Sequence, residues 1–178
     1  KIVQVEIDKK VIEVSRKYLP GISQGSFDDK KVELVYTDGT KYIKSHKNAF
    51  DIIVLDLTDS IPGGPSEKLF DVPFFKDVKK ALTPSGIVSV QSGNLFLQPD
   101  WVKMLYKKIR SCFPWVELHS AFVPSYESSL FGFTYASSSH LPKLKISQIE
   151  KNFKNIKGKN KYIRPCTYYG SLVLSQVK

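Results

Sequence analysis

Runs of apolar residues separated by polar segments recur along the chain and predict its strands. Ile2 to Ile7 and Phe50 to Leu57 are rich in β-branched residues and nearly continuous, rather than alternating in polarity. Such runs are typical of strands that are buried on both faces of a parallel sheet. Lys31 to Tyr36 gives the next candidate strand, and Ile87 to Val90 another. We therefore expect strands in these segments.

Helical patterns lie between the predicted strands. Residues 9–18 follow Asp8, whose side chain can cap a helix, and residues 100–111 carry apolar side chains at helical spacing. The Lys-rich segment 140–161 is expected to be a surface excursion before a last strand at 171–174. Strands that alternate with helices predict an α/β fold with a doubly wound, mostly parallel sheet. In this architecture ligands bind beyond the carboxyl ends of the strands.

Composition and charge exclude several classes of protein. The chain has 178 residues, 42% hydrophobic and 25% charged, and contains no apolar run long enough to span a bilayer. Its two cysteines lie far apart without metal-ligand spacing, so we expect no metal site and a cytoplasmic setting. The formal net charge of +10 comes from scattered lysines. We interpret it as a solvated surface and expect neither nucleic acid nor a membrane as a partner.

Carboxylates follow the predicted strands. Glu6, at the end of the first, can accept both hydroxyls of a ribose, although a helix start also explains an acid there. Asp38 can accept the exocyclic amine of an adenine while Gly39 lets the base approach the backbone, although Asp-Gly is also a common turn. Asp56 and Asp59 end an apolar run before a loop rich in glycine and proline, where a simple turn is again the alternative.

A series of short motifs occurs in the order and at the spacing of spermidine synthases. These are Val-Glu-Ile-Asp at 5–8, Phe-Asp-Asp at 27–29, Tyr-Thr-Asp-Gly at 36–39, Asp-Leu-Thr-Asp at 56–59, Gly-Pro-Ser-Glu-Lys-Leu-Phe at 64–70 and Gln-Ser-Gly at 91–93. The resemblance to this polyamine aminopropyltransferase family covers nearly all of the chain. It implies a Rossmann-like fold of the class I S-adenosylmethionine-dependent methyltransferase type. The family's first strand and small β domain would precede Lys1, so we expect residues 1–178 to form a single catalytic domain that is incomplete at its N-terminus.

The resemblance also implies an activity. The expected reaction transfers an aminopropyl group from decarboxylated S-adenosylmethionine, a co-substrate, to putrescine, and gives spermidine and methylthioadenosine without a metal or resident cofactor. A homodimer or homotetramer is expected. The open alternatives are transfer to agmatine, cadaverine or spermidine, an S-adenosylmethionine-dependent methyltransferase, and a catalytically silent scaffold.

Roles for individual residues follow from the same resemblance. The residues assigned to the donor are Glu6, Ile7, Asp38, Gly39, Pro65 and Leu69. Asp56 is expected to be the general base, since an amine that is protonated in water must lose a proton before it can attack. The residues assigned to the acceptor amine are Asp59, Gln91 and Tyr126. Tyr126 has aromatic neighbours in sequence, so a place in the core is the alternative for its ring.

Overall fold

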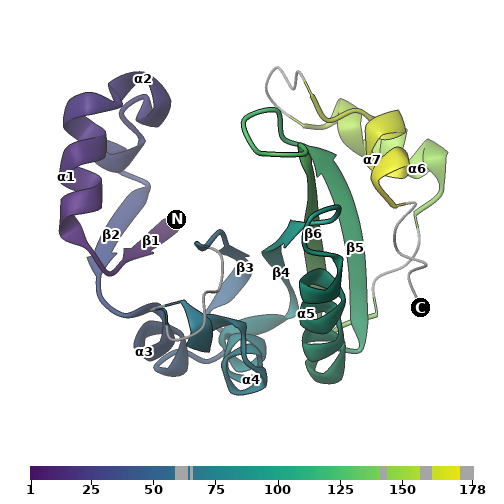
Figure 1. Ribbon diagram of the computed structural model, residues 1–178, viewed down its shortest axis with the longest axis horizontal. Coiled ribbons are helices and arrows are strands. Elements are labelled where there is room, and N and C mark those ends of the chain that lie inside the picture. Colours follow the sequence, from purple (N-terminus) through teal and green to yellow (C-terminus); the bar gives the residue numbers. More distant parts are fainter. Residues whose placement is uncertain (59–63, 65, 141–143, 157–161, 173–178) are drawn as a thin grey trace. The chain divides into compact units, whose positions relative to one another are not determined.

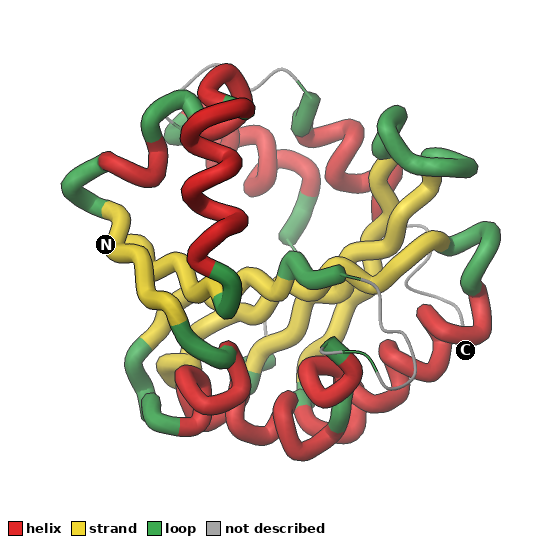
Figure 2. Tube along the Cα trace, turned by 60° about the vertical axis from the view of Figure 1, so that its left-hand side comes forward, coloured by secondary structure: helices red, strands yellow, loops and turns green. Residues whose placement is uncertain are grey.

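The computed structural model describes residues 1–58, 64, 66–140, 144–156 and 162–172. Helical segments and strands alternate as far as residue 122, after which a second consecutive strand and two helices follow, and grey marks the segments outside the described chain (Figure 2). The chain divides into two compact units, Lys1–Lys47 and Asn48–Lys178. The single domain expected over residues 1–178 stays a prediction.

The first unit contains a pair of parallel strands. Its elements, in chain order, are β1 (Ile2–Glu6), α1 (Lys9–Tyr18), α2 (Pro20–Ser23), the 3-10 helix η1 (Ser26–Asp28), β2 (Val32–Tyr36) and α3 (Gly39–Lys44). As expected, Asp8 caps α1, because its Oδ1 accepts a hydrogen bond from the Lys10 N–H at 2.8 Å. The apolar side chains of Ile12 in α1 and Ile43 in α3 are buried.

The second unit is built on a sheet with the strand order β3-β4-β6-β5 (Figure 1). Its elements, in chain order, are β3 (Phe50–Leu55), the 3-10 helix η2 (Glu67–Phe70), α4 (Val72–Ala81), β4 (Leu82–Asn94), α5 (Pro99–Cys112), β5 (Trp115–Phe122), β6 (Leu130–Ser137), α6 (Ile146–Lys154) and α7 (Pro165–Ser171). Strands β3 and β4 are parallel, whereas β6 runs antiparallel to both β4 and β5. The sheet is therefore mixed.

The core of the second unit lies where α4 and α5 pack together and against β4. Its fully buried residues include Phe75, Val78, Val88, Val90, Leu105 and Ile109. Burying one such aliphatic or aromatic side chain contributes about 1.5–3 kcal/mol. These contacts fix β4 rigidly between its neighbours, which matters because β4 carries one of the predicted site residues.

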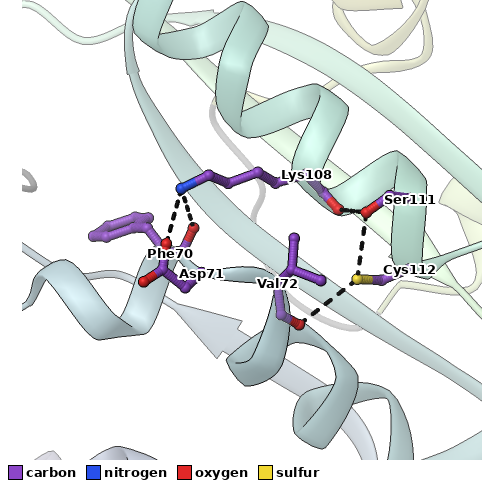
Figure 3. Close-up of polar contacts among 6 residues, drawn as sticks. All are labelled: Phe70, Asp71, Val72, Lys108, Ser111 and Cys112. Carbon is purple, nitrogen blue, oxygen red and sulfur yellow. Dashed lines mark hydrogen bonds and ion pairs between the residues drawn. The ribbon is translucent and has the colours of Figure 1, made fainter.

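Polar contacts join the start of α4 to α5 (Figure 3). The Lys108 ammonium lies 2.9 Å from Asp71 Oδ1 and donates to the Phe70 carbonyl at 3.3 Å. The Cys112 thiol donates weakly to the Val72 carbonyl at 3.8 Å. Partly exposed ion pairs add little stability. Lys108 instead positions the end of η2, because it donates to the carbonyl of Phe70, the last residue of that helix.

The expected burial of strands on both faces is wrong for β3. Its side chains alternate, with Ile53 and Leu55 buried at 7% and 8% exposure and Ile52 and Val54 exposed at 68% and 67%. Successive side chains of a strand point to opposite faces of the sheet, so described residues cover β3 on one face only. An apolar run does not distinguish a covered face from an open one.

The strand expected at 171–174 also needs correction. Ser171 ends the helix α7 and Leu172 caps it, so the expectation is wrong at its first two residues, and residues 173 and 174 lie outside the described residues. Pro165 at the first turn favours a helix because its missing N–H is not needed there. The segment 140–161, expected to be a surface excursion, contains the helix α6, and most of its described residues are exposed, as expected.

Candidate functional site

The strand ends of the first unit bring the predicted donor residues side by side. In the parallel pair, Glu6 lies opposite Tyr36, and the Thr37 N–H donates to the Glu6 carbonyl at 3.0 Å. Asp38 and its neighbour Gly39 follow directly. Because both strands end at the same edge, the two predicted donor carboxylates lie on that edge.

The Glu6 carboxylate is held by the turn into α1. Its Oε1 accepts a hydrogen bond from the Asp8 N–H at 2.9 Å. The side chain is half-buried, and the neighbouring Ile7 is exposed. A carboxylate has two oxygens with several acceptor positions, so this contact leaves room for ribose hydroxyls. The helix-start interpretation is confirmed for Asp8, and the donor role of Glu6 and Ile7 stays a prediction.

Asp38 caps α3 and is held ionised. Its Oδ1 accepts hydrogen bonds from the Thr40 N–H at 2.8 Å and from the Thr40 hydroxyl at 2.7 Å. The Thr40 hydroxyl, followed by the Thr40 N–H, lowers the pKa of the Asp38 carboxyl below its usual value. Asp38 is therefore an anionic acceptor in a fixed orientation. Gly39 is the first residue of α3, so Asp38 and Gly39 begin a helix and the turn interpretation is wrong.

The second unit places Asp56 beside Gln91. Leu55 at the end of β3 lies opposite Val90 in β4, so the next residues of the two parallel strands are neighbours. Asp56 is exposed and makes no hydrogen bond or ion pair with the residues that the structure describes. Gln91 is half-buried. The Asp56 carboxylate is thus accessible at the carboxyl end of β3, where ligands bind in folds of this type.

A bulge in β4 shapes the strand next to Gln91. The register between β4 and β6 shifts between Gln91 and Gly93. Gly93 has a φ of 97°, and a Cβ there would lie 3.1 Å from the Trp101 ring, so only glycine fits. Ser92 is fully buried and its hydroxyl lies 2.7 Å from that of Thr134. Bulges are common next to ligand sites, and this one directly follows Gln91.

The loop between β5 and β6 carries Tyr126 to the same edge. Asn94 at the end of β4 lies opposite Phe131 at the start of β6, so this loop and the carboxyl end of β4 are at one end of the sheet, the upper end in Figure 1. Tyr126 is 56% exposed, and its ring centroid lies 4.7 Å from that of Phe131. The alternative of a core position for Tyr126 is therefore wrong.

Leu69 lies in η2, close to the helices of the second unit. It is half-buried, and the next residue, Phe70, is 2% exposed and meets the Trp101 ring edge-on at 5.5 Å. The predicted residues Asp59 and Pro65 lie outside the described residues.

The structure therefore assembles two groups of predicted residues, one in each unit. Asn94 is a further residue that the sequence analysis missed. It is 4% exposed and bonds to the loop that carries Tyr126. The available signal was weak: asparagine favours turns, and this one follows the Gln-Ser-Gly motif directly.

A pocket of about 630 Å³ lies elsewhere in the second unit, between α7 and the sheet face that carries Glu117 and His119. None of the predicted site residues lines it. His119 is 7% exposed, and its ring nitrogens lie 2.9 Å from the Ser171 hydroxyl and 3.4 Å from a Glu117 carboxylate oxygen. Burial lowers the pKa of His119, and Glu117 opposes that shift. We take this pocket as separate from the candidate site.

No described helix is long and apolar enough to cross a membrane. Within the described ranges, no three His, Cys, Asp or Glu side chains gather in a way that could hold a metal ion. The absence of a metal requirement stays a prediction.

Sequence comparison relates the chain to polyamine enzymes. The model of the spermine/spermidine synthase domain family matches residues 1–154. A polyamine aminopropyltransferase of Thermoplasma volcanium is 42% identical over 137 residues, which cover 77% of this chain and 49% of that protein. One of Caldicellulosiruptor saccharolyticus is 38% identical over 155 residues, which cover 85% of this chain and 55% of that protein. The chain spans about half the length of these curated relatives.

Solved structures show the same relationship. A spermidine synthase in complex with the transition state analogue AdoDATO is 30% identical with a TM-score of 0.85, over 97% of this chain and 57% of that one. Spermidine synthase from Thermotoga maritima is 29% identical with a TM-score of 0.83, over 97% of this chain and 56% of that one. The predicted α/β, Rossmann-like fold of the class I S-adenosylmethionine-dependent methyltransferase type is confirmed. With these strands, strand ends and motifs, the chain belongs to the spermine/spermidine synthase domain family.

Proposed function

We propose that the protein transfers an aminopropyl group from decarboxylated S-adenosylmethionine to putrescine and releases spermidine and methylthioadenosine. Membership of the family supports the reaction type. The observation that carries the proposal is the position of Asp56, an accessible carboxylate next to Gln91 at the edge that the Tyr126 loop shares. That edge offers a proton acceptor, an amide and an aromatic ring to a diamine.

The chemistry requires a group such as Asp56. An alkyl ammonium has a pKa of about 10 and no lone pair near neutrality. The Asp56 carboxylate accepts a proton from the ammonium, and the freed nitrogen attacks the carbon next to the sulfonium. As the new N–C bond forms, the C–S bond breaks and its electron pair stays on sulfur, which leaves as a neutral thioether. A positioned base typically contributes a factor of about 10²–10⁴ to the rate.

The strand ends of the first unit suit the adenosine part of the donor. The ionised Asp38 can accept a hydrogen bond from the adenine amine, and the Glu6 carboxylate can accept bonds from the ribose hydroxyls. No metal or resident cofactor takes part in this proposal, because alignment of amine, carbon and sulfur and one base suffice for the displacement. We also propose that the protein acts as a cytoplasmic homo-oligomer, which light scattering would test.

The test is to give the intact protein decarboxylated S-adenosylmethionine with putrescine, agmatine, cadaverine or spermidine in separate reactions. Release of methylthioadenosine together with spermidine in the putrescine reaction is the expected result. Release of methylthioadenosine with only one of the other amines would identify that amine as the acceptor. No release with any amine would contradict aminopropyl transfer, and methyl transfer from S-adenosylmethionine would then be assayed by release of S-adenosylhomocysteine.

A further inference from the structure

The buried side-chain amide of Asn94 connects the turn after β4 to the loop between β5 and β6. Asn94, the last residue of β4, accepts hydrogen bonds at Oδ1 from the Phe96 and Leu97 N–H groups, both at 2.9 Å. The same oxygen accepts a bond from the Ser128 hydroxyl at 2.8 Å, and Nδ2 donates to the Glu127 carbonyl at 2.7 Å. Two bonds therefore hold the turn after β4, and two hold the loop between β5 and β6.

The loop that Asn94 holds has an unfavourable backbone. Ser128 and Ser129 both have a φ of 55°, in the left-handed region that residues other than glycine rarely adopt. Such conformations persist where surrounding contacts impose them, and they are common at functional sites. The loop's bonds between Val123, Tyr126 and Ser129 are local. The bonds from Asn94 reach across more than thirty residues of sequence, so they fix the loop relative to the sheet.

We propose that Asn94 is a positioning residue that sets the place of the Tyr126 ring for the acceptor amine, which rests on the function proposed above. Asn94 holds the carbonyl of Glu127, the residue directly after Tyr126. It also lies three positions beyond Gln91 on β4. The Asn94 side chain thus links the strand that carries Gln91 to the loop that carries Tyr126. It therefore fixes the backbone positions of these two residues relative to each other.

Asn94 uses its amide oxygen and its amide nitrogen for different contacts, so a substitution that changes only the nitrogen distinguishes a positioning role from a purely structural one. Asn94→Asp keeps the Oδ1 acceptor for the turn after β4 and for Ser128. It replaces the Nδ2 donor with an oxygen that faces the Glu127 carbonyl, so the turn survives while the loop loses one of its two bonds to Asn94. Since one hydrogen bond is lost and two acceptors repel, we expect the KM for putrescine to rise about tenfold or more. The KM for the donor and the kcat at saturating putrescine should stay within about twofold of the wild type, as for a contact that serves only amine binding.

Two further variants complete the test. Ser139→Ala is the matched control, because the Ser139 hydroxyl donates to the Pro84 carbonyl at 2.6 Å beyond the opposite end of β6. It removes a comparable bond away from the loop, and the putrescine KM should not change. Ser128→Ala removes the other bond between the loop and Asn94 and should raise the putrescine KM about threefold. If Asn94→Asp does not fold, Ser128→Ala tests the proposal in its place. Hydrogen exchange of residues 123–129 reports the loop directly and should speed up in Asn94→Asp.

The outcomes are distinct. A higher putrescine KM with faster exchange of the loop and an unchanged donor KM supports the proposal. An unchanged putrescine KM, or equal rises in the KM values of both substrates, overturns it and leaves the proposed function standing. If the wild-type protein transfers aminopropyl to none of the four amines, the proposed function fails and the inference fails with it.

Discussion

The two groups of site residues are held in place by different kinds of contact. In the first unit, each carboxylate is fixed by a residue two positions along the chain: Glu6 by Asp8, and Asp38 by Thr40. In the second unit, the loop with Tyr126 depends on Asn94, which bonds to residues 33 and 34 positions away. The first unit thus positions its proposed donor residues Glu6 and Asp38 by local turns, whereas the second unit positions the loop proposed to face the amine by tertiary contacts.

The largest effect is expected from Asp56→Asn. Loss of the base should lower turnover by about 100-fold or more, because asparagine cannot accept the proton of the ammonium. Initial rates at saturating donor and putrescine measure this. Asp51→Asn is the matched control, since Asp51 lies in β3, the strand that Asp56 directly follows, and accepts a 3.3 Å bond from the Thr83 hydroxyl. Near-normal turnover of Asp56→Asn would remove Asp56 from the mechanism.

The fold and the site could be predicted from the sequence to different extents. The caps at Asp8 and Asp38 were predictable, because Asp before a helix start bonds to backbone a few residues away. The parallel strands followed from their apolar runs. The burial of Asn94 and the bulge at Gly93 could not be predicted, since both depend on β6 and its loop. The open face of β3 was missed because an apolar run does not reveal what packs on it.

A second prediction concerns the donor. Glu6→Gln keeps the acceptor for the Asp8 N–H but removes the charge, so the KM for the donor should rise about tenfold while turnover at saturation changes little. The control is Glu13→Gln, which removes an exposed acid of α1 that lies 3.8 Å from Lys9 Nζ. An unchanged donor KM in Glu6→Gln would reject the ribose assignment.

The cap at Asp38 offers a smaller effect on stability. Asp38→Ala removes the acceptor for the Thr40 N–H and should lower the free energy of unfolding by about 1 kcal/mol. Asp38→Asn keeps an acceptor and should lose far less, since asparagine is also a good cap. Urea unfolding of both variants measures the difference. Equal losses would mean that the charge, rather than the cap, stabilises this turn.

The smallest effect is a pH dependence in the second unit, where His119 bonds to Ser171 over 52 positions. Burial lowers the pKa of His119 from its ordinary value of 6.5, so below that pH the unfolded chain binds more protons than the folded one. The stability from neutral His119 is therefore complete above about pH 6.5 and is lost as the pH falls through the folded pKa. Melting temperatures between pH 5 and 8 should fall on the acid side, and His119→Gln should flatten the curve. A wild-type curve as flat as that of the variant would contradict the burial of neutral His119.

The most direct test of the division between donor and amine sides is a calorimetric titration with methylthioadenosine, which carries the ribose and adenine of the donor. It would be run in parallel on the wild type, Glu6→Gln and Asp56→Asn. We predict that Glu6→Gln weakens binding about tenfold, the effect of losing a charged hydrogen-bond acceptor, while Asp56→Asn binds like the wild type. Equal losses in both variants, or a loss in Asp56→Asn alone, would contradict the account.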